Sequence, residues 1–250
     1  MSKVTKPAAS SVPVITVDGP SGSGKGTISR LLSEATGFAL LDSGALYRLT
    51  ALACSKAGVE ASNEASVAGV AQQLDVKFTV VANAVEVQLA GEVVTQAIRK
   101  EAIGMLASKV AAYPSVRAAL LTRQRDFLQA PGLVADGRDM GTVVFPHAPV
   151  KVFLTASPEE RAKRRVLQLQ ALGTKAIDEA KILADIKARD ERDTNRSAAP
   201  LLPAEDALQL DSTQMSIEEV YTTIMKEVDR RQLRAAQASG LQTNRQGESE

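Results

Sequence analysis

The sequence predicts an α/β fold in which helices cover both faces of a parallel five-stranded core sheet. Short apolar runs rich in Val, Ile and Leu alternate with longer segments of helical spacing, as is typical of strands buried on both faces. A glycine-rich turn separates the first apolar run from the first helix. Residues 75–95 alternate apolar and polar positions instead, and we interpret them as an antiparallel hairpin inserted into this fold.

The first half of the chain contributes two strands and two helices to the core. Strands are assigned to 14–17 and 38–41, which are short and apolar. Helices are assigned to 27–35 and 45–57, where apolar residues recur on one helical face. This order of strand, helix, strand and helix is the one expected for parallel strands joined by crossover helices.

The middle of the chain combines the hairpin with two helices. The hairpin strands are 76–81 and 85–89, and a third short strand is expected at 93–94. Helical spacing then resumes at 96–112 and 115–129. This middle region therefore departs from the simple alternation of the core.

The remaining elements return to that alternation. Three apolar strands are expected at 133–135, 150–155 and 207–210, and three helices are expected to begin near Pro158, Asp178 and Ile217. Ser216 precedes the last of these helices and is suited to cap it. With the two strands of the first half, these three complete the five-stranded sheet.

The composition limits the kinds of partner that the protein is expected to bind. The chain has 250 residues, 44% of them hydrophobic, with a net charge of +1. It lacks the basic excess that nucleic-acid or membrane-surface binding usually needs, so neither partner is expected. The single cysteine, Cys54, has no partner in the chain for a disulfide, which fits a reducing compartment. The sequence shows no apolar stretch of ~18 residues and no secretory signal, so we expect a cytoplasmic protein.

The loop between the first strand and the first helix carries the first functional motif. It consists of Gly19, Pro20, Ser21, Gly22, Ser23, Gly24, Lys25, Gly26 and Thr27. Glycines let several backbone N–H groups point at one phosphate, and the following helix adds its positive end. Lys25 can reach the β and γ phosphates, and Thr27 can support magnesium. The loop predicts an ATP-binding site; a glycine-rich turn that binds nothing is the alternative.

Four motifs together resemble the bacterial cytidylate kinase family. They are DGPSGSGKGT at 18–27, LDSGALYR at 41–48, DGRDMGT at 136–142 and RDERDTNR at 189–196. The resemblance implies a P-loop three-layer fold with a parallel five-stranded core sheet, an acceptor-binding insert containing a small antiparallel sheet, and a short helical lid. It implies transfer of the γ-phosphoryl of ATP to CMP or dCMP, giving ADP and CDP or dCDP, with Mg²⁺ as cofactor.

The resemblance also suggests how the chain is divided. We expect a flexible arm at 1–12, a single kinase domain at 13–231 and a flexible tail at 232–250. Within the domain, the core is assigned to 13–60, 113–157 and 197–231, the acceptor-binding insert to about 61–112 and the lid to about 158–196. We expect a monomer whose partners are small-molecule nucleotides, namely ATP and CMP or dCMP.

Residues that would read the cytosine base come from three of these segments. The resemblance places Ser43, Ser108, Arg117 and Asp139 around the base. Asp139 is suited to accept a hydrogen bond from the exocyclic amine, and Arg117 can donate to the ring carbonyl. A pocket of this kind rejects a wrong base because its polar groups would stay unpaired. The alternatives are that Ser43 caps the following helix and that Arg117 is a surface charge.

Other residues would hold the phosphate and the ribose of the acceptor. Arg48 and Arg138 are expected as phosphate clamps, because a guanidinium can bind a phosphate through two hydrogen bonds. Tyr47 would pack beside the nucleotide, or is an ordinary half-buried aromatic residue.

The charged segment near residue 190 also points to the acceptor. Arg189, Asp193 and Arg196 are spaced to share one helix face. By resemblance Arg189 and Asp193 bind the ribose and Arg196 binds phosphate. A ladder of exposed ion pairs is the alternative.

Catalysis is expected from cationic side chains, because phosphoryl transfer needs positioning and charge neutralisation. This role is assigned to Lys25, Arg138, Arg161, Arg165 and Arg196. For the arginines of the expected lid, the assignment rests on the resemblance. Gly173 lies at the expected tip of the lid and is a possible hinge.

The expected metal site involves two side chains near the phosphate loop. Asp136, which also counts among the expected substrate-binding residues, follows an apolar strand and would hold Mg²⁺ mostly through water, together with Thr27. The alternative is that Asp136 caps a turn.

Two rival functions use the same phosphate loop. One is a small-molecule kinase with another acceptor, such as a different nucleotide or a shikimate-type polyol. The set Ser43, Arg117 and Asp139 argues against it. The other is a GTP-driven switch, but the sequence contains no Asn-Lys-x-Asp guanine motif.

Overall fold

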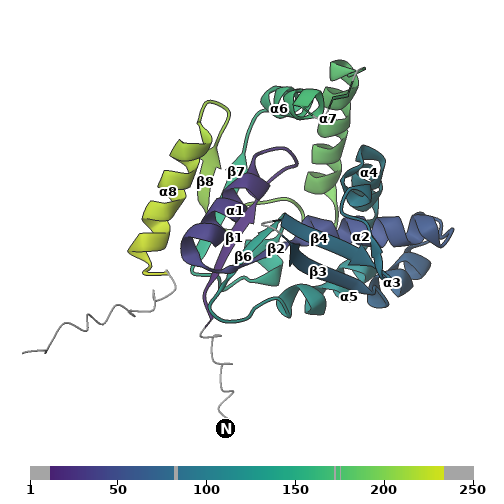
Figure 1. The fold of residues 1–250 in the computed structure, drawn as a ribbon. Coiled ribbons are helices and arrows are strands. Elements are labelled where there is room, and N and C mark those ends of the chain that lie inside the picture. The colour runs from purple at the N-terminus through teal and green to yellow at the C-terminus, as the bar shows by residue number, and fades with distance from the viewer. Residues whose placement is uncertain (1–11, 82–83, 172, 175, 234–250) are drawn as a thin grey trace, which may run out of the picture.

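The computed structural model describes residues 12–81, 84–171, 173–174 and 176–233. Its centre is a parallel five-stranded sheet in the order β2-β6-β1-β7-β8 (Figure 1). The strands are β1 (Val14–Asp18), β2 (Ala39–Asp42), β6 (Leu133–Gly137), β7 (Val150–Thr155) and β8 (Leu208–Asp211). The sheet confirms the predicted fold class. Almost all of the expected arm and tail lies outside the described residues.

Two helices cover one face of the core sheet. They are α1 (Lys25–Thr36) and α8 (Ile217–Arg230), which lie side by side. Leu32 and Ile224 are fully buried against Ile15 of β1. Removing a side chain of this size from water contributes about 1.5–3 kcal/mol, so the apolar stripe of each helix determines its placement. Ser216 caps α8, as predicted.

The opposite face is covered by helices from the first half and the middle of the chain. These are α2 (Ser43–Lys56) and α5 (Pro114–Arg125), and α3 (Glu64–Gln72) packs against both of them. Leu46 of α2 and Leu120 of α5 are fully buried in one cluster with Leu133 of β6. Asp42, which precedes α2, pairs in register with Asp136 of β6. The first turn of α2 and the carboxyl end of β6 therefore lie close together, where the acceptor-site residues are expected.

The inserted hairpin is present. β3 (Val76–Val81) and β4 (Ala84–Leu89) pair antiparallel, and β5 (Glu92–Val93) adds a short third strand. The single helix expected at 96–112 is wrong. The segment splits into a short 3-10 turn (η1, Ala97–Arg99) and α4 (Glu101–Val110), because Lys100 adopts an extended backbone with ψ 141°.

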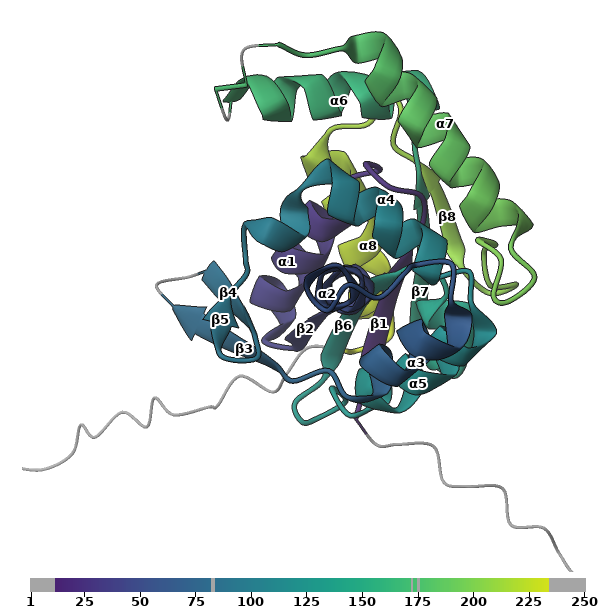
Figure 2. The same ribbon diagram turned by 90° about the vertical axis from the view of Figure 1, so that its right-hand side faces the viewer.

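The helical pair that follows β7 forms an arch above the rest of the molecule (Figure 2). α6 (Pro158–Ala171) and α7 (Glu179–Asn195) pack against each other. Asp178 caps α7 by accepting a hydrogen bond from the Lys181 amide across 2.9 Å. Gly173 has a positive φ of 76°, while Leu172 of the expected tip lies outside the described residues. No helix in the described ranges is long and apolar enough to cross a membrane.

A wide π-helical turn follows β6 and was not expected. This turn, η2 (Met140–Val144), begins directly after Arg138 and Asp139. The predicted end of the preceding strand was also too early, because β6 continues to Gly137 and includes Asp136. The strand therefore places Asp136, Arg138 and Asp139 at the carboxyl end of the sheet, where the phosphate loop also begins.

Candidate active site

The phosphate loop is shaped by glycines at positions that another residue could not occupy without strain. Gly19 has φ 148°, and a Cβ there would lie 2.0 Å from the carbonyl oxygen of Leu154 in β7. Gly24 has φ 95° and immediately precedes α1. The loop thus turns tightly from β1 into the N-terminus of α1, where free N–H groups and the helix dipole favour an anion.

Lys25 lies inside this loop. It is buried, and its Nζ donates to the carbonyl oxygen of Pro20 across 2.8 Å. The hydroxyl of Ser23 donates to the same oxygen across 3.1 Å. Burial lowers the pKa of Lys25 to about 7, and the nearby positive charge of Arg138 acts in the same direction. An anionic ligand would oppose both effects, so the site is suited to phosphate.

Asp136 and Thr27 fit a magnesium ion held mainly by water and phosphate oxygens. A Cβ on Gly26 would lie 3.7 Å from Oδ2 of Asp136, so the carboxylate adjoins the first turn of α1. Desolvation raises the pKa of Asp136 to about 6, against the opposing effect of Lys25. Thr27 is exposed on the same turn. A carboxylate and a hydroxyl are oxygen donors of the kind that Mg²⁺ prefers. Since Asp136 lies within β6, the alternative that it caps a turn is wrong.

One cavity brings together most of the predicted acceptor residues. Its lining includes Ser43, Tyr47, Ser108, Arg117, Arg138, Asp139, Arg189, Asp193 and Arg196. These residues come from α2, α4, α5, the segment after β6, and the end of α7. Helices α2, α4, α5 and α7 therefore converge on one polar site, and Arg189 of this site bonds to Ser21 of the phosphate loop.

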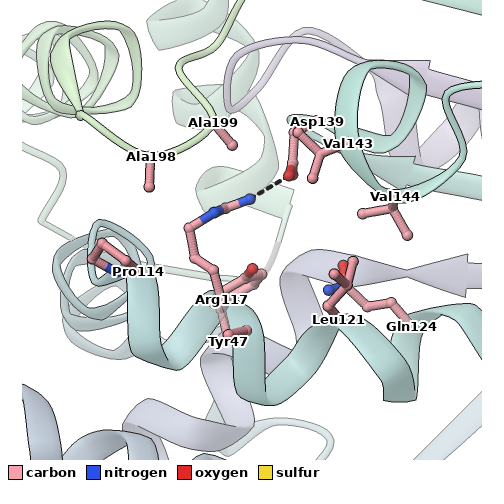
Figure 3. Close-up of a pocket in the computed structure, with 11 residues that line it drawn as sticks. Tyr47, Pro114, Arg117, Leu121, Gln124, Asp139, Val143, Val144, Ala198 and Ala199 are labelled. Carbon is pink, nitrogen blue, oxygen red and sulfur yellow. Dashed lines mark hydrogen bonds and ion pairs between the residues drawn. The ribbon is translucent and has the colours of Figure 1, made fainter.

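Arg117 and Asp139 form an ion pair at one wall of this site (Figure 3). Their side chains are only 11% and 3% exposed, so the alternative that Arg117 is a surface charge is wrong. Arg117 also donates to the carbonyl oxygen of Ala111 across 3.1 Å, and its guanidinium lies 5.6 Å from the centre of the Tyr47 ring. The guanidinium of Arg117 is a hydrogen-bond donor and the carboxylate of Asp139 is an acceptor, so the pair places a donor and an acceptor side by side.

Figure 3 shows a second cavity beyond this pair. Its volume is about 260 Å³, and Tyr47, Arg117 and Asp139 line both cavities. Its other walls include the apolar side chains of Leu121 and Val144. Tyr47 is buried rather than half-buried and lies between the two cavities as a shared lining residue.

Asp193, which lines the first of these two cavities, connects three elements. Its carboxylate accepts from Nε of Arg138 across 3.0 Å and from the Ser108 hydroxyl across 3.4 Å. Burial alone would raise the pKa of Asp193, but nearby guanidiniums, led by that of Arg138, hold it below its ordinary value. This buried contact across elements replaces the alternative of an exposed ladder along α7.

Two expected features of the α2 and α7 ends need correction. Ser43 does not cap α2, because Asp42 accepts a hydrogen bond from the Ala45 amide across 3.0 Å. Arg196 does not share a helix face with Arg189 and Asp193, because α7 ends at Asn195 and Arg196 has an extended backbone. Arg196 still lines the cavity and donates from Nε to the carbonyl oxygen of Ala199 across 2.6 Å.

Arg48 lies beside the cavity but is not among its lining residues. Its guanidinium donates to the carbonyl oxygen of Ile98 across 3.0 Å, and a Cβ on Gly104 of α4 would lie 3.3 Å from it. Burial lowers the pKa of Arg48. Arg48 thus joins α2 to η1 and α4.

The arch contacts the phosphate loop through two arginines. Arg161 donates to the carbonyl oxygen of Ser21 across 3.0 Å and forms a two-bond ion pair with Asp190. Arg189 donates to the Ser21 hydroxyl across 3.2 Å. Burial, with help from Arg138, lowers the pKa of Arg189 to about 10. Both arginines therefore lie against Ser21 of the phosphate loop.

Arg165 contacts the insert instead. It forms an ion pair with Glu101 of α4 across 3.1 Å. Of the predicted catalytic cations, Arg165 lies away from the phosphate loop in this arrangement, whereas Lys25, Arg138 and Arg161 lie at or beside it.

Sequence reasoning assigned no role to three residues that organise the site. Asp18 accepts hydrogen bonds from two backbone amides of the turn after Asp139. Asp190 forms an ion pair with Arg161, and Arg192 donates to the Ser108 hydroxyl across 2.8 Å. Each bond joins segments far apart in the chain. The motifs contain Asp18, Asp190 and Arg192, but their spacing carries no signal for these partners.

The chain is similar to known proteins over most of its length. The sequence model of the family described as cytidylate kinase matches residues 15–230. The chain is 63% identical to a cytidylate kinase of Saccharophagus degradans over 220 residues, which cover 88% of this chain and 98% of that protein. It is 58% identical to a cytidylate kinase of Stutzerimonas stutzeri over 224 residues, covering 89% and 97% of the two chains. The chain therefore belongs to the cytidylate kinase family.

Proposed function

We propose that this protein transfers the γ-phosphoryl group of ATP to CMP or dCMP, giving ADP and CDP or dCDP, within pyrimidine nucleotide metabolism. Family membership supports the reaction class. The single observation that carries the acceptor is the buried Arg117–Asp139 pair beside the phosphate loop. A cytosine edge offers an amine to a carboxylate and a ring carbonyl to a guanidinium, so this pair matches it.

On the donor side, the loop from Gly19 to Thr27 binds the phosphates of ATP. Backbone N–H groups and the α1 N-terminus contact the phosphate oxygens, and Lys25 bridges to the outer phosphates. Mg²⁺, when bound, neutralises charge on these phosphates. Thr27 would hold it directly and Asp136 mostly through water.

On the acceptor side, the cavity holds CMP by its three parts. Ser43, Ser108, Arg117 and Asp139 bind the base, while Arg189 and Asp193 bind the ribose. Arg48, Arg138 and Arg196 bind the phosphate, and Tyr47 packs beside the nucleotide. Arg48 and Arg117 have other partners in the present arrangement, so binding requires both guanidiniums to turn toward the nucleotide.

In the transfer step, the protein positions the two nucleotides and supplies positive charge. The charge on the moving phosphoryl group is stabilised by Lys25, Arg138, Arg161, Arg165 and Arg196.

We assign the core to 13–60, 113–157 and 197–231, the acceptor insert to about 61–112 and the lid to about 158–196. Closing the lid brings Arg165 inward and excludes water, which would otherwise hydrolyse ATP. We further propose a cytoplasmic monomer that binds neither nucleic acid nor membranes.

The test is an ADP-release assay with ATP and Mg²⁺, comparing CMP, dCMP, UMP, AMP and no acceptor. Turnover with CMP and dCMP that clearly exceeds turnover with UMP and AMP is the expected result. Turnover only with another acceptor would contradict the assigned base site and leave the phosphate loop in place. No acceptor-dependent turnover at all would contradict the proposed reaction.

A further inference from the structure

Asp18 lies between the two halves of the active site. It is the last residue of β1 and directly precedes Gly19 of the phosphate loop. Only 4% of it is exposed. One carboxylate oxygen accepts from the Met140 amide and the other from the Gly141 amide, each across 2.8 Å. The roles proposed above do not use this carboxylate.

The two amides belong to the turn that carries the acceptor residues. Met140 directly follows Arg138 and Asp139, and η2 begins at Met140. The carbonyl oxygen of Asp139 accepts from the amides of Val143 and Val144 across 2.9 and 3.1 Å. The backbone at Asp139 is therefore held by the π-helical turn on one side and by Asp18 on the other.

The turn packs closely against β1 at Gly141. A Cβ on Gly141 would lie 2.9 Å from the Thr16 hydroxyl and 3.4 Å from Oδ2 of Asp18. The turn thus rests directly on β1, at the end of the strand from which the phosphate loop departs. A shift of the Asp18 contact would move Arg138 and Asp139 relative to Lys25.

We propose that Asp18 is a positioning residue that sets the acceptor-binding segment at Arg138 and Asp139 against the ATP phosphate loop. The inference rests on the proposed roles of Arg138 and Asp139 at the acceptor. Asp18 touches neither nucleotide. It acts through the Met140 and Gly141 amides, so its loss impairs the binding of CMP more than the binding of ATP.

The first test is Asp18→Asn. The amide keeps the shape and one acceptor oxygen, but it turns an N–H donor toward a second N–H donor. We expect the KM for CMP to rise about tenfold or more while the KM for ATP changes less than about twofold. Hydrogen exchange of the Met140 and Gly141 amides should accelerate, while exchange elsewhere in β1 and β6 stays slow.

Thr16→Val is the matched control. Thr16 lies on the same strand two positions earlier, so its side chain points to the same face. Its hydroxyl is buried without a hydrogen-bond partner among the described residues, and valine has nearly the same shape. This variant should keep both KM values. An equal rise in the KM for CMP in Thr16→Val would assign the effect to the packing of the turn on β1 and not to the hydrogen bonds of Asp18, and would overturn the inference.

Asp139→Asn separates this inference from the site on which it rests. If Asp139→Asn leaves the KM for CMP unchanged, the proposed acceptor site itself is wrong. If it raises that KM and Asp18→Asn does not, the positioning role is wrong. Should Asp18→Asn fail to fold, Gly141→Ala displaces the same turn with Asp18 intact and should raise the KM for CMP; an unchanged KM would overturn the inference.

Discussion

Arg138 and Asp193 meet across 3.0 Å and join the segment after β6 to the last turn of α7. The Asp193 side chain is 5% exposed and that of Arg138 18%. Removing one member of a buried pair leaves the other charge without compensation, which usually costs more than the pair contributes.

Asp193→Ala should therefore lower both stability and acceptor binding. We expect a loss of about 3 kcal/mol in the free energy of unfolding, and a higher KM for CMP because Arg138 and Ser108 lose their shared partner. Urea unfolding and steady-state kinetics measure the two effects. Glu191→Ala, on an exposed position of the same helix, removes the same charge and should change neither. Equal effects in both variants would contradict a specific role for Asp193.

Asp139→Asn should weaken the discrimination between bases. A site that accepts a hydrogen bond from an exocyclic amine favours cytosine over uracil, and the amide can both donate and accept. We expect the ratio of kcat/KM for CMP to that for UMP to fall by about tenfold or more. Asp126→Asn, on an exposed residue at the end of α5, is the control. An unchanged ratio in Asp139→Asn would show that the base is read elsewhere.

Binding of ATP should be accompanied by proton uptake in mildly alkaline solution. The pKa of Lys25 in the free protein is about 7, so the amine is mostly neutral above that pH, and phosphates raise the pKa again. Calorimetric titrations near pH ~8, in two buffers of different ionisation enthalpy, should differ by the heat of up to about one proton. Lys25→Arg stays charged and should remove the difference. Equal enthalpies for the unaltered protein would contradict the shifted pKa.

Gly19→Ala should be far more damaging than the same change at another left-handed glycine. Its Cβ would lie 2.0 Å from a backbone oxygen of β7, whereas at Gly58 (φ 67°) a Cβ would have nothing within 4 Å. We expect Gly19→Ala to cost about 3 kcal/mol or more and to abolish ATP binding, and Gly58→Ala to cost about 1 kcal/mol through backbone strain alone. Thermal unfolding with and without ATP checks both. Similar losses of stability in the two variants would mean that the backbone of β7 can move away at Leu154.

Local patterns predicted the features that depend on neighbouring residues. The phosphate loop, the strand at 150–155 and the cap at Ser216 follow from glycine spacing, apolar runs and capping chemistry within a few positions. The gathering of Ser43, Arg117 and Asp139 at one cavity was reached through the family resemblance, and the structure brings them together. Their roles toward a nucleotide stay predictions until the assays above are made.

The features that were missed depend on tertiary contacts. Helix α3, rich in Ala, Gly, Ser and Val, has little apolar periodicity of its own and is defined by packing on α5. Lys100 interrupts a region of helical spacing although no Gly or Pro marks the break. Asp18 finds Met140 at a separation of 122 positions, and no sequence pattern from one chain indicates such a pairing.

The strand order has a consequence for how the protein is made. β1 lies between β6 and β7, so its neighbours on both sides come from the second half of the chain. As the chain emerges from the ribosome, β1, the phosphate loop and α1 appear early and must wait until β6 has been synthesised before the first pairing of the core sheet can form. Non-local pairing of this kind slows folding and leaves strand edges open in the meantime. The N-terminal half is therefore the part of the nascent chain that most needs protection from aggregation.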